Sequence, residues 1–345
     1  MSLRGLTMAS NTTTNSTKPV EDCGINMEAW ALALPSLYFA IFPPALLLNL
    51  VVAWICLHLK TNSNFMVYLK HLVAADLLMT MTYPIRGASE LPGASDGLHA
   101  FACRFSSVFF YLAMNMSVIL MGLISLDRYL KIVRSGGSLL CQNLLFSNIL
   151  SFFFWFALIC SNTLPIIITS NQDPTNKTGE FCIAMKSKLG IAWHEAVIII
   201  SKVIFWAVCI LNVFCYTFIA KTVLESYQRS RGNNDKRKRK AKFRVFLILL
   251  VFFICYLPYH SIRIPYTNLQ VQANVTCYKQ SLRIGKDFTL WLSAINVCLD
   301  PLIYFFLCRD FRERFLEICD IKSLFPSYRK NKDASQTTDT SQQAQ

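Results

Sequence analysis

Basic and aromatic residues recur at helical spacing in two apolar stretches toward the end of the chain. His260, Arg263 and Tyr266 follow one another at three-residue steps, which places them along one side of a helix. Lys286 lies about one turn into the next apolar stretch and would face them. A guanidinium can bind phosphate through two parallel hydrogen bonds, and an ammonium acts as a point charge. The pattern predicts a cationic pocket suited to phosphate, unless an acid such as Asp287 pairs with the cations.

Three other residues extend this candidate pocket. Tyr111 could stack on a base, although ordinary packing explains it equally well. Lys202 follows His194 and Ile198 at four-residue steps, so we expect it on the same helical face. A further cation deep in the pocket would favour a more anionic ligand. The alternatives are that Lys202 extends toward the membrane surface or meets an internal acid.

The stretches that carry these residues belong to a chain with the composition of a membrane protein. Of 345 residues, 54% are hydrophobic and only 16% charged, and the mean hydropathy is +0.39. A helix that crosses a hydrocarbon core of about 30 Å needs about 20 mainly apolar residues. Seven such windows are predicted, at Trp30–Leu57, Phe65–Leu91, Ala100–Val133, Asn143–Ser170, Ala192–Leu224, Phe243–Asn268 and Ile284–Leu307.

The expected fold is therefore all-α, a seven-helix transmembrane bundle. Residues 1–29 would form an extracellular N-terminal segment, residues 30–307 the bundle, and residues 308–345 a cytoplasmic tail that begins with a short amphipathic helix. No internal repeat is found, which argues against a transporter, the main alternative of another class.

Charge sets the orientation of the bundle. The net charge of +14 gathers in the loop after the fifth span and in the tail, and the side with excess Lys and Arg is cytoplasmic. Seven spans then place the N-terminus outside. We expect the run Lys236–Lys240 to be a solvated charged loop or a patch attracted to anionic membrane lipid, with contact to a partner protein as the alternative, and not a nucleic-acid site. Four glycosylation sequons fall on the predicted outer side, at Asn11, Asn15, Asn176 and Asn274.

Four of the 13 cysteines also fall on the outer, oxidising side. They allow three pairings. Cys103 at the mouth of the third span and Cys182 in the loop after the fourth favour a bridge that would fix that loop over the bundle, which leaves Cys23 for Cys277. On the inner side, Cys308 and Cys319 flank a basic segment and are candidates for S-acylation.

Ionisable residues inside the spans mark function, because their burial in a membrane is costly. Asp76 and Asp300 are expected to form a buried switch that holds a shared proton or a sodium ion, with Ser117 and Asn296 as further oxygen ligands. No catalytic set, phosphate loop or cofactor motif is present in the sequence, so we expect neither an enzyme nor a cofactor.

Three short motifs complete the pattern. Asp127-Arg128-Tyr129 ends the third span, Cys255 to Pro258 reads CYLP in the sixth, and the seventh holds DPLIY, with Asp300, Pro301 and Tyr304. Together with Cys103 and Cys182, they resemble the rhodopsin-like G-protein-coupled receptors from about Cys23 to Cys319. The seventh-span motif begins with Asp where most of that family has Asn. Pro258 removes a backbone hydrogen bond and is expected to bend its helix. The resemblance implies an inner latch at Asp127, Arg128 and Tyr129.

A narrower resemblance comes from the segments LKHLVAADLLMT, FFICYLPYHSIRIPYT and GKDFTLWLSAINVCLDPLIYFFLC. They are similar to the purinergic nucleotide receptors, in the branch that answers to ADP and UDP-sugars. The chain departs from that branch at Asn115, where relatives have Tyr, and at Ile166 and Ile198, where relatives have Asn. The resemblance implies that the ligand is contacted by Tyr111, His194, His260, Arg263, Tyr266 and Lys286.

The function expected from residues and resemblance together is that of a plasma-membrane receptor. It would bind an extracellular ADP-like nucleotide and activate an inhibitory-class heterotrimeric G protein, because agonist binds the active arrangement more tightly. A receptor for another anionic ligand, such as a lysophospholipid, is the alternative, and it would need a more apolar pocket.

Overall fold

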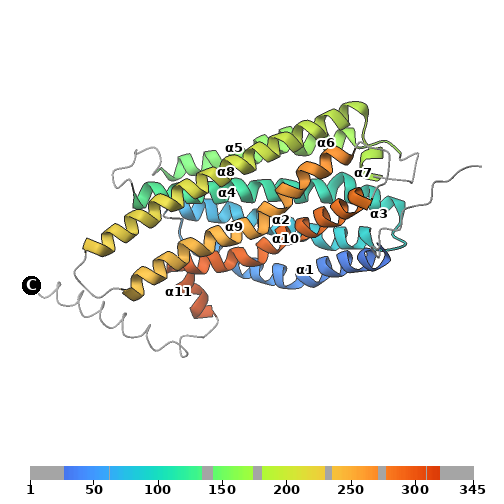
Figure 1. The fold of residues 1–345 in the computed structure, drawn as a ribbon. Coiled ribbons are helices and arrows are strands. Elements are labelled where there is room, and N and C mark those ends of the chain that lie inside the picture. The colour runs from blue at the N-terminus through green and yellow to red at the C-terminus, as the bar shows by residue number, and fades with distance from the viewer. Residues whose placement is uncertain are drawn as a thin grey trace, which may run out of the picture.

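The computed structural model describes residues 27–61, 63–133, 143–173, 181–229, 235–270, 277–307 and 309–318. Within these ranges the chain is helical and contains no strand (Figure 1). The helices are α1 (Met27–His58), α2 (Asn64–Glu90), α3 (Asp96–Phe101), α4 (Ser107–Ile132), α5 (Leu144–Leu158), α6 (Leu164–Thr169), α7 (Phe181–Ala184), α8 (Lys188–Arg229), α9 (Asp235–Gln270), α10 (Cys277–Leu307) and α11 (Arg309–Ile318).

Seven helical units in the described part of the chain are long and apolar enough to cross a membrane. Two of them are composite. The π-helical segment η1 (Ala102–Ser106) joins α3 to α4, and η3 (Ile159–Thr163) joins α5 to α6. Each of the seven overlaps one predicted span, and the short helix α11 turns away from the bundle after the last (Figure 1). The predicted all-α, seven-helix fold is confirmed.

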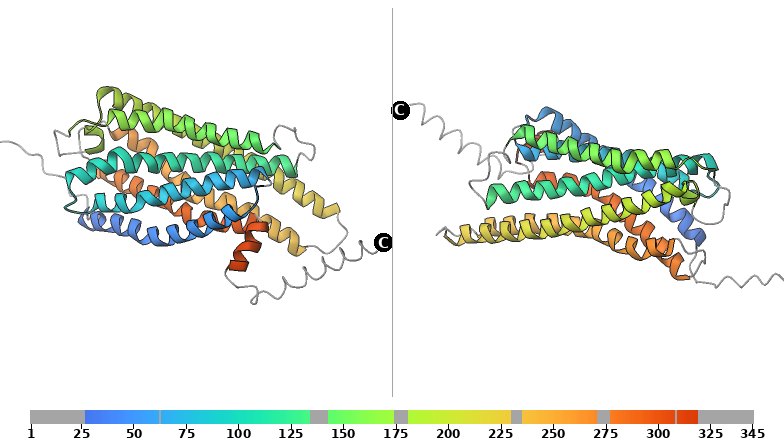
Figure 2. Two further views of the ribbon diagram at one scale, coloured as in Figure 1. Left: turned by 180° about the vertical axis from the view of Figure 1, so that it is seen from behind. Right: turned by 90° about the horizontal axis from the view of Figure 1, so that it is seen from above.

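One boundary differs clearly from the prediction. The sixth span was expected from Phe243, with Lys236–Lys240 in a loop, but α9 already begins at Asp235. Lysine and arginine are good helix formers, so a basic sequence can continue a helix beyond the apolar window. Both α8 and α9 extend past their neighbours at the end where α11 lies (Figures 1 and 2).

Several helices begin at a polar side chain that accepts a hydrogen bond from a free backbone N–H. The Ser63 hydroxyl accepts from Met66 N at 3.4 Å, and the Asn143 side chain accepts from Leu145 N at 2.9 Å. Ser95 caps α3 in the same way, at 3.2 Å from Leu98 N. Such caps satisfy donors that have no partner within the helix, and they fix where α2, α3 and α5 start.

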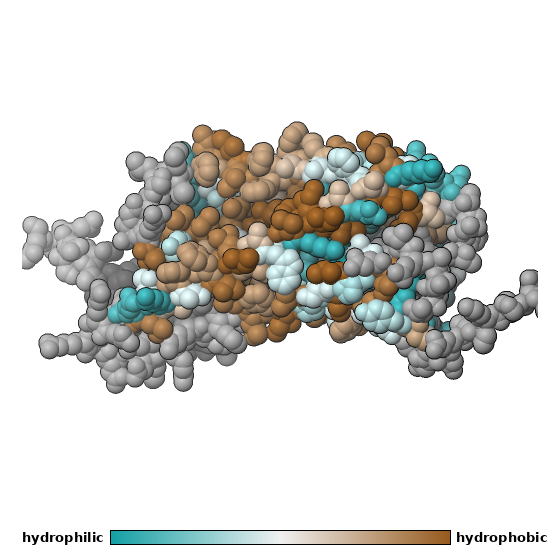
Figure 3. All heavy atoms as spheres, turned by 45° about the horizontal axis from the view of Figure 1, so that its top comes forward, coloured by the Kyte–Doolittle hydropathy of each residue, from teal (hydrophilic) through white to brown (hydrophobic). Residues whose placement is uncertain are grey.

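The core lies along α4, the most enclosed of the spans, which runs through the middle of the bundle (Figure 2). Aromatic side chains from α1, α2, α4, α9 and α10 are fully buried there, among them Tyr38, Tyr83, Phe110, Phe252 and Tyr304. The face of the bundle seen in Figure 3 is also largely apolar. Leu57 and Phe156, for example, are 79% and 68% exposed. Exposed apolar side chains of this kind are what a lipid environment requires.

Candidate functional site

A cavity of about 210 Å³ opens at the end of the bundle opposite α11. It has room for far more than one water molecule. Residues of α2, α4, η3, α6, α8, α9 and α10 line it. Five of the predicted ligand residues are among them, namely Tyr111, His194, Arg263, Tyr266 and Lys286.

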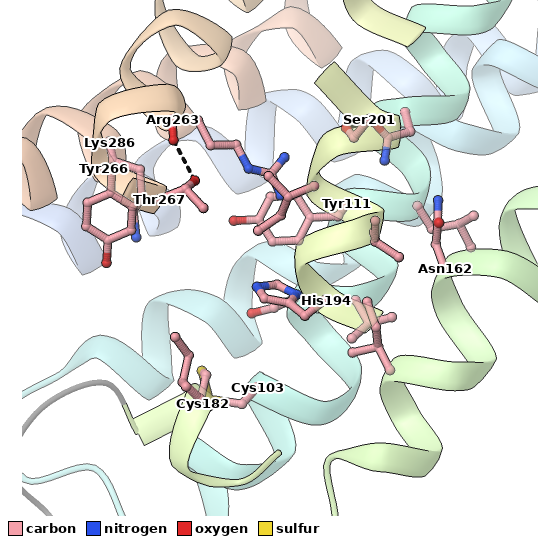
Figure 4. Close-up of a pocket in the computed structure, with 18 of the residues that line it drawn as sticks. Cys103, Tyr111, Asn162, Cys182, His194, Ser201, Arg263, Tyr266, Thr267 and Lys286 are labelled. Atoms are coloured by element: carbon pink, nitrogen blue, oxygen red, sulfur yellow. Dashed lines mark hydrogen bonds between the residues drawn. A yellow bond between two sulfur atoms is a disulfide. The ribbon is translucent and has the colours of Figure 1, made fainter. Parts of the chain in front are cut away.

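A disulfide closes one side of this cavity. Cys103 in η1 and Cys182 in α7 are joined, with their Cα atoms 5.3 Å apart, and both residues line the cavity (Figure 4). The predicted bridge between the third span and the loop after the fourth is confirmed. The backbone N–H of Ser187 donates to Thr169 O at 3.0 Å, which holds the chain after α7 against α6. The loop is thus fixed at both ends of its described part.

Arg263 and Tyr111 meet across the middle of the cavity (Figure 4). The Arg263 guanidinium carbon lies 5.3 Å from the centroid of the Tyr111 ring and 5.5 Å from that of Tyr259. Arg263 is 8% exposed, and the two rings stack at 6.4 Å. A cation over aromatic faces is stabilised without neutralising its charge. Arg263 is therefore held in place and can still bind an anion.

Lys286 is held differently. Its ammonium lies 4.8 Å from the centroid of the Tyr266 ring and 2.7 Å from Asp287 Oδ1. Lys286 is thus paired with an internal acid, which is the alternative to a free phosphate-binding cation that the sequence left open. The pair is only partly exposed, with the Lys286 and Asp287 side chains 20% and 16% accessible. An anionic ligand at Lys286 must therefore compete with Asp287.

Two cations that line the cavity were not predicted. Arg86 of α2 donates through Nε to the Tyr38 hydroxyl at 3.2 Å, and its guanidinium carbon lies 4.7 Å from the centroid of the Phe110 ring. Lys186 follows α7, and its ammonium donates to Ser170 Oγ at 3.2 Å. Burial lowers the pKa of Lys186 to about 8.

The cavity as a whole is therefore electropositive. Four cations line it, Arg86, Lys186, Arg263 and Lys286, against the two acids Glu90 and Asp287. The formal balance of the side chains is 4 − 2 = +2 with neutral histidine. An enclosed excess of positive charge attracts anions, because field lines concentrate in a low-dielectric cleft.

Two predicted ligand residues lie outside the cavity lining. His260 is fully buried, and its ring stacks flat on Phe205 at 3.9 Å between centroids. Lys202 of α8 is half-buried and does not line the cavity. These two side chains therefore do not line the cavity with the other five.

The motifs at the opposite end of the bundle form contacts of their own. Asp127 pairs with Lys131, whose ammonium lies 2.9 Å from Oδ1. The Arg128 guanidinium carbon lies 4.1 Å from the centroid of the Phe65 ring of α2. Tyr129 packs on Phe214 and Phe218 of α8, at 5.5 and 6.1 Å between centroids. Of the motif prolines, Pro258 lies inside α9 next to Tyr259, which lines the cavity, and Pro301 lies inside α10.

Buried oxygen atoms gather between these two ends. The Tyr304 hydroxyl donates to Asp76 Oδ2 at 3.1 Å, and Asn296 Nδ2 donates to Asp300 Oδ2 at 2.7 Å. Ser117 Oγ, Asn296 Oδ1 and the Oδ1 atoms of Asp76 and Asp300 are buried without a hydrogen-bond partner in the described part of the chain. Hard cations bind oxygen ligands of this kind. The sodium ion stays a prediction.

Several predicted sites lie outside the described residues. Cys277 begins α10 and is disulfide-bonded. The sites outside are its expected partner Cys23, the sequons at Asn11, Asn15, Asn176 and Asn274, and the acylation candidates Cys308 and Cys319.

The sequence matches the family model of the 7 transmembrane receptors of the rhodopsin family over residues 49–304. Human purinoceptor 13 is 40% identical over 295 residues, covering 85% of this chain and 83% of that protein. Bovine purinoceptor 14 is 41% identical over 300 residues, covering 86% and 89%. Mouse G-protein coupled receptor 87 is 38% identical over 300 residues, covering 86% and 83%.

The match places the chain in a class of multi-pass receptors of the plasma membrane, which take an extracellular ligand and a G protein as partners and are not enzymes. The chain belongs to the rhodopsin-like G-protein-coupled receptors, in the purinoceptor group.

Proposed function

We propose that this receptor binds an extracellular nucleotide of the ADP type in the cavity and signals through an inhibitory-class G protein. The observation that carries the proposal is the excess of cations around Tyr111, with Arg263 held by two aromatic rings and free to bind an anion. Guanidinium and ammonium groups bind the phosphates, and an aromatic face can stack on the base. The names of the human and bovine relatives support a nucleotide ligand.

The cavity communicates with the other end of the bundle through α9. Arg263 lies one to two turns from Pro258 in this helix. A ligand that binds Arg263 therefore acts close to the point where the helix lacks a backbone N–H donor. Agonist shifts the population toward the arrangement that it binds more tightly. Arg128 and Phe65 then separate, and the inner end opens toward the G protein.

The orientation follows from charge. The N-terminus lies outside, so that the cavity faces the extracellular medium and α11 the cytoplasm. An epitope tag placed before Asn11 should be stained on intact cells. Staining that appears only after permeabilisation would reverse this orientation.

The test is a ligand panel with a G-protein readout. Cells that express the receptor are challenged with nucleoside mono-, di- and triphosphates, a UDP-sugar and a lysophospholipid, and dissociation of inhibitory, stimulatory and phospholipase-coupled G proteins is followed. A nucleoside diphosphate acting through the inhibitory class is the expected result. A response to the lysophospholipid alone would favour the other anionic ligand.

Two variants make the test specific to the cavity. A hydrogen bond to a charged group contributes roughly 1.5–3 kcal/mol, so Arg263→Gln should weaken the agonist about ten- to a hundredfold. Arg283→Gln is the matched control, because Arg283 is exposed on α10 and does not line the cavity. An unchanged nucleotide response in the double variant Arg263→Gln, Lys286→Gln would exclude this pocket.

A further inference from the structure

One part of the cavity contains buried neutral polar groups that the phosphate chemistry leaves unused. Asn115 of α4, Asn162 of η3 and Ser201 of α8 line it, and they are 5%, 7% and 2% exposed. Lys286 and Tyr266 stand on one side of Tyr111 and Asn162 on the other (Figure 4). The cationic residues and the two amides are thus supplied by different helices.

The hydrogen bonds of this cluster leave its amide donors open. The Ser201 hydroxyl donates to Asn115 Oδ1 at 2.7 Å, which directs the Asn115 Nδ2 group elsewhere. Ser161 Oγ lies 3.3 Å from Asn162 Oδ1, but its single hydrogen is used at 2.6 Å by Ala157 O. In the described part of the chain, neither Asn115 Nδ2 nor Asn162 Nδ2 takes part in a hydrogen bond. Both amide groups line the cavity, so they are available to donate to a ligand, and each such hydrogen bond adds affinity.

The position of Asn162 is fixed by its surroundings. Asn162 lies in the π-helical segment η3, and the Trp193 indole N–H of α8 donates to Ser161 O at 2.8 Å in the same segment. Turns of this kind are common at functional sites. The bond ties η3 to α8, which also carries Ser201. The three polar groups therefore belong to one braced unit.

Apolar side chains border the same cluster. Val108, Ile166 and Val197 pack against one another, and all three line the cavity together with Ile198. Branched aliphatic walls next to amide groups suit a planar ring, which presents apolar faces and a polar edge. An acyl chain would fill the apolar space but would leave both amides without a partner.

We infer that Asn115, Asn162 and Ser201 form the subsite that reads the hydrogen-bonding edge of the ligand's purine base. Asn162 offers an amide donor beside an amide acceptor, the arrangement that pairs with the amino group and the adjacent ring nitrogen of adenine. Asn115 offers only a donor, because its oxygen is taken by Ser201. Asn115 therefore donates to a second ring nitrogen. This inference rests on the proposed nucleotide function.

The test compares ADP with purine riboside diphosphate, which lacks the 6-amino group, by competition binding on membranes. In the parent receptor ADP should bind more tightly. A good bidentate hydrogen-bonded pair changes affinity by roughly ten- to a hundredfold between the right and the wrong base. Asn162→Leu should therefore weaken the binding of ADP by about that factor and the binding of the analogue less than about threefold. Asn148→Leu is the matched control, since Asn148 lies in α5 of the same span, donates to Leu144 O and does not line the cavity.

Ser201→Ala provides a second, smaller perturbation. It removes the hydrogen bond that the Ser201 hydroxyl donates to Asn115 Oδ1, so the Asn115 amide is no longer held in one orientation. The affinity for ADP should then fall about two- to fivefold. Cell-surface staining shows whether each variant folds. Equal losses for ADP and the analogue in Asn162→Leu and no loss in Ser201→Ala would overturn the subsite. The result is separable from the proposed function, which fails instead if no nucleotide binds or if Arg263→Gln has no effect.

Discussion

Asp287 should limit how tightly the receptor binds phosphate, and its removal should therefore raise affinity. Asp287 Oδ1 lies 2.7 Å from the Lys286 ammonium, within a cavity whose cations outnumber its acids. The change Asp287→Asn keeps the shape of the side chain and removes its charge. Lys286 remains oriented by Tyr266, whose ring centroid lies 4.8 Å from the ammonium.

The size of the effect follows from Coulomb's law. A phosphate bound to Lys286 would lie about 5 Å from the Asp287 carboxylate, because each takes one hydrogen bond of about 2.8 Å from the same ammonium. Two unit charges at that separation repel by about 3 kcal/mol at an effective dielectric constant of about 20. Water in the open cavity reduces this to about 1–2 kcal/mol, or about five- to thirtyfold in affinity.

Competition binding with a series that shares one nucleoside checks this reasoning. Asp287→Asn should leave the affinity for the nucleoside unchanged and raise the affinity for the monophosphate slightly. It should raise the affinity for the diphosphate by the full factor of about five- to thirtyfold. Glu90→Gln is the control, because Glu90 lines the same cavity but is exposed, and it should change affinity less than about threefold. A uniform loss across the series in Asp287→Asn would mean that Asp287 positions Lys286 and does not oppose the ligand.

Three other predictions concern single residues. Lys202→Gln should leave the rank order of mono-, di- and triphosphates unchanged, because Lys202 does not line the cavity, and a selective loss of triphosphate affinity would refute this. Since burial lowers the pKa of Lys186 to about 8, its charge is present below that pH and lost above it, so diphosphate affinity should fall from about pH 7 to about pH 9. Lys186→Arg, which stays charged, should abolish that fall. Arg128→Ala should reduce G-protein activation and change agonist affinity only a few-fold, because its contact with Phe65 lies at the end of α4 remote from the cavity; parallel losses of surface expression, binding and signalling would instead make Arg128 structural.

The fold could be predicted because each span carries its own signal. A window of about 20 apolar residues is recognisable without knowledge of its neighbours. The start of α9 was missed for the same reason, since a basic sequence gives no hydropathy signal although it can be helical. The π-helical segments η1 and η3 also have no characteristic amino-acid composition that would predict them, because they depend on how neighbouring helices pack.

The candidate site was only partly predictable. Lys202 was expected beside His194, yet eight residues at about 100° each rotate a side chain by about 80° from its starting direction. His260 lies three residues from Arg263 and so points about 60° away from it, toward Phe205. Arg86 lies inside a predicted span, so its charge alone signals a functional position. Lys186 lies outside any periodic stretch, so no neighbouring pattern predicts its place in the cavity lining.

The π-helical segment η3 has a consequence for comparing this chain with its relatives. A π turn closes its hydrogen bond over one more residue than an α turn does, so it is equivalent to a single inserted residue. If a relative has a regular α-helix here, a correct structural alignment needs a one-residue gap between Ile159 and Thr163. An ungapped alignment would then match every residue on one side of η3 to a neighbour about 100° away around the helix. Ligand contacts transferred between receptors across this segment would be assigned to the wrong side chain.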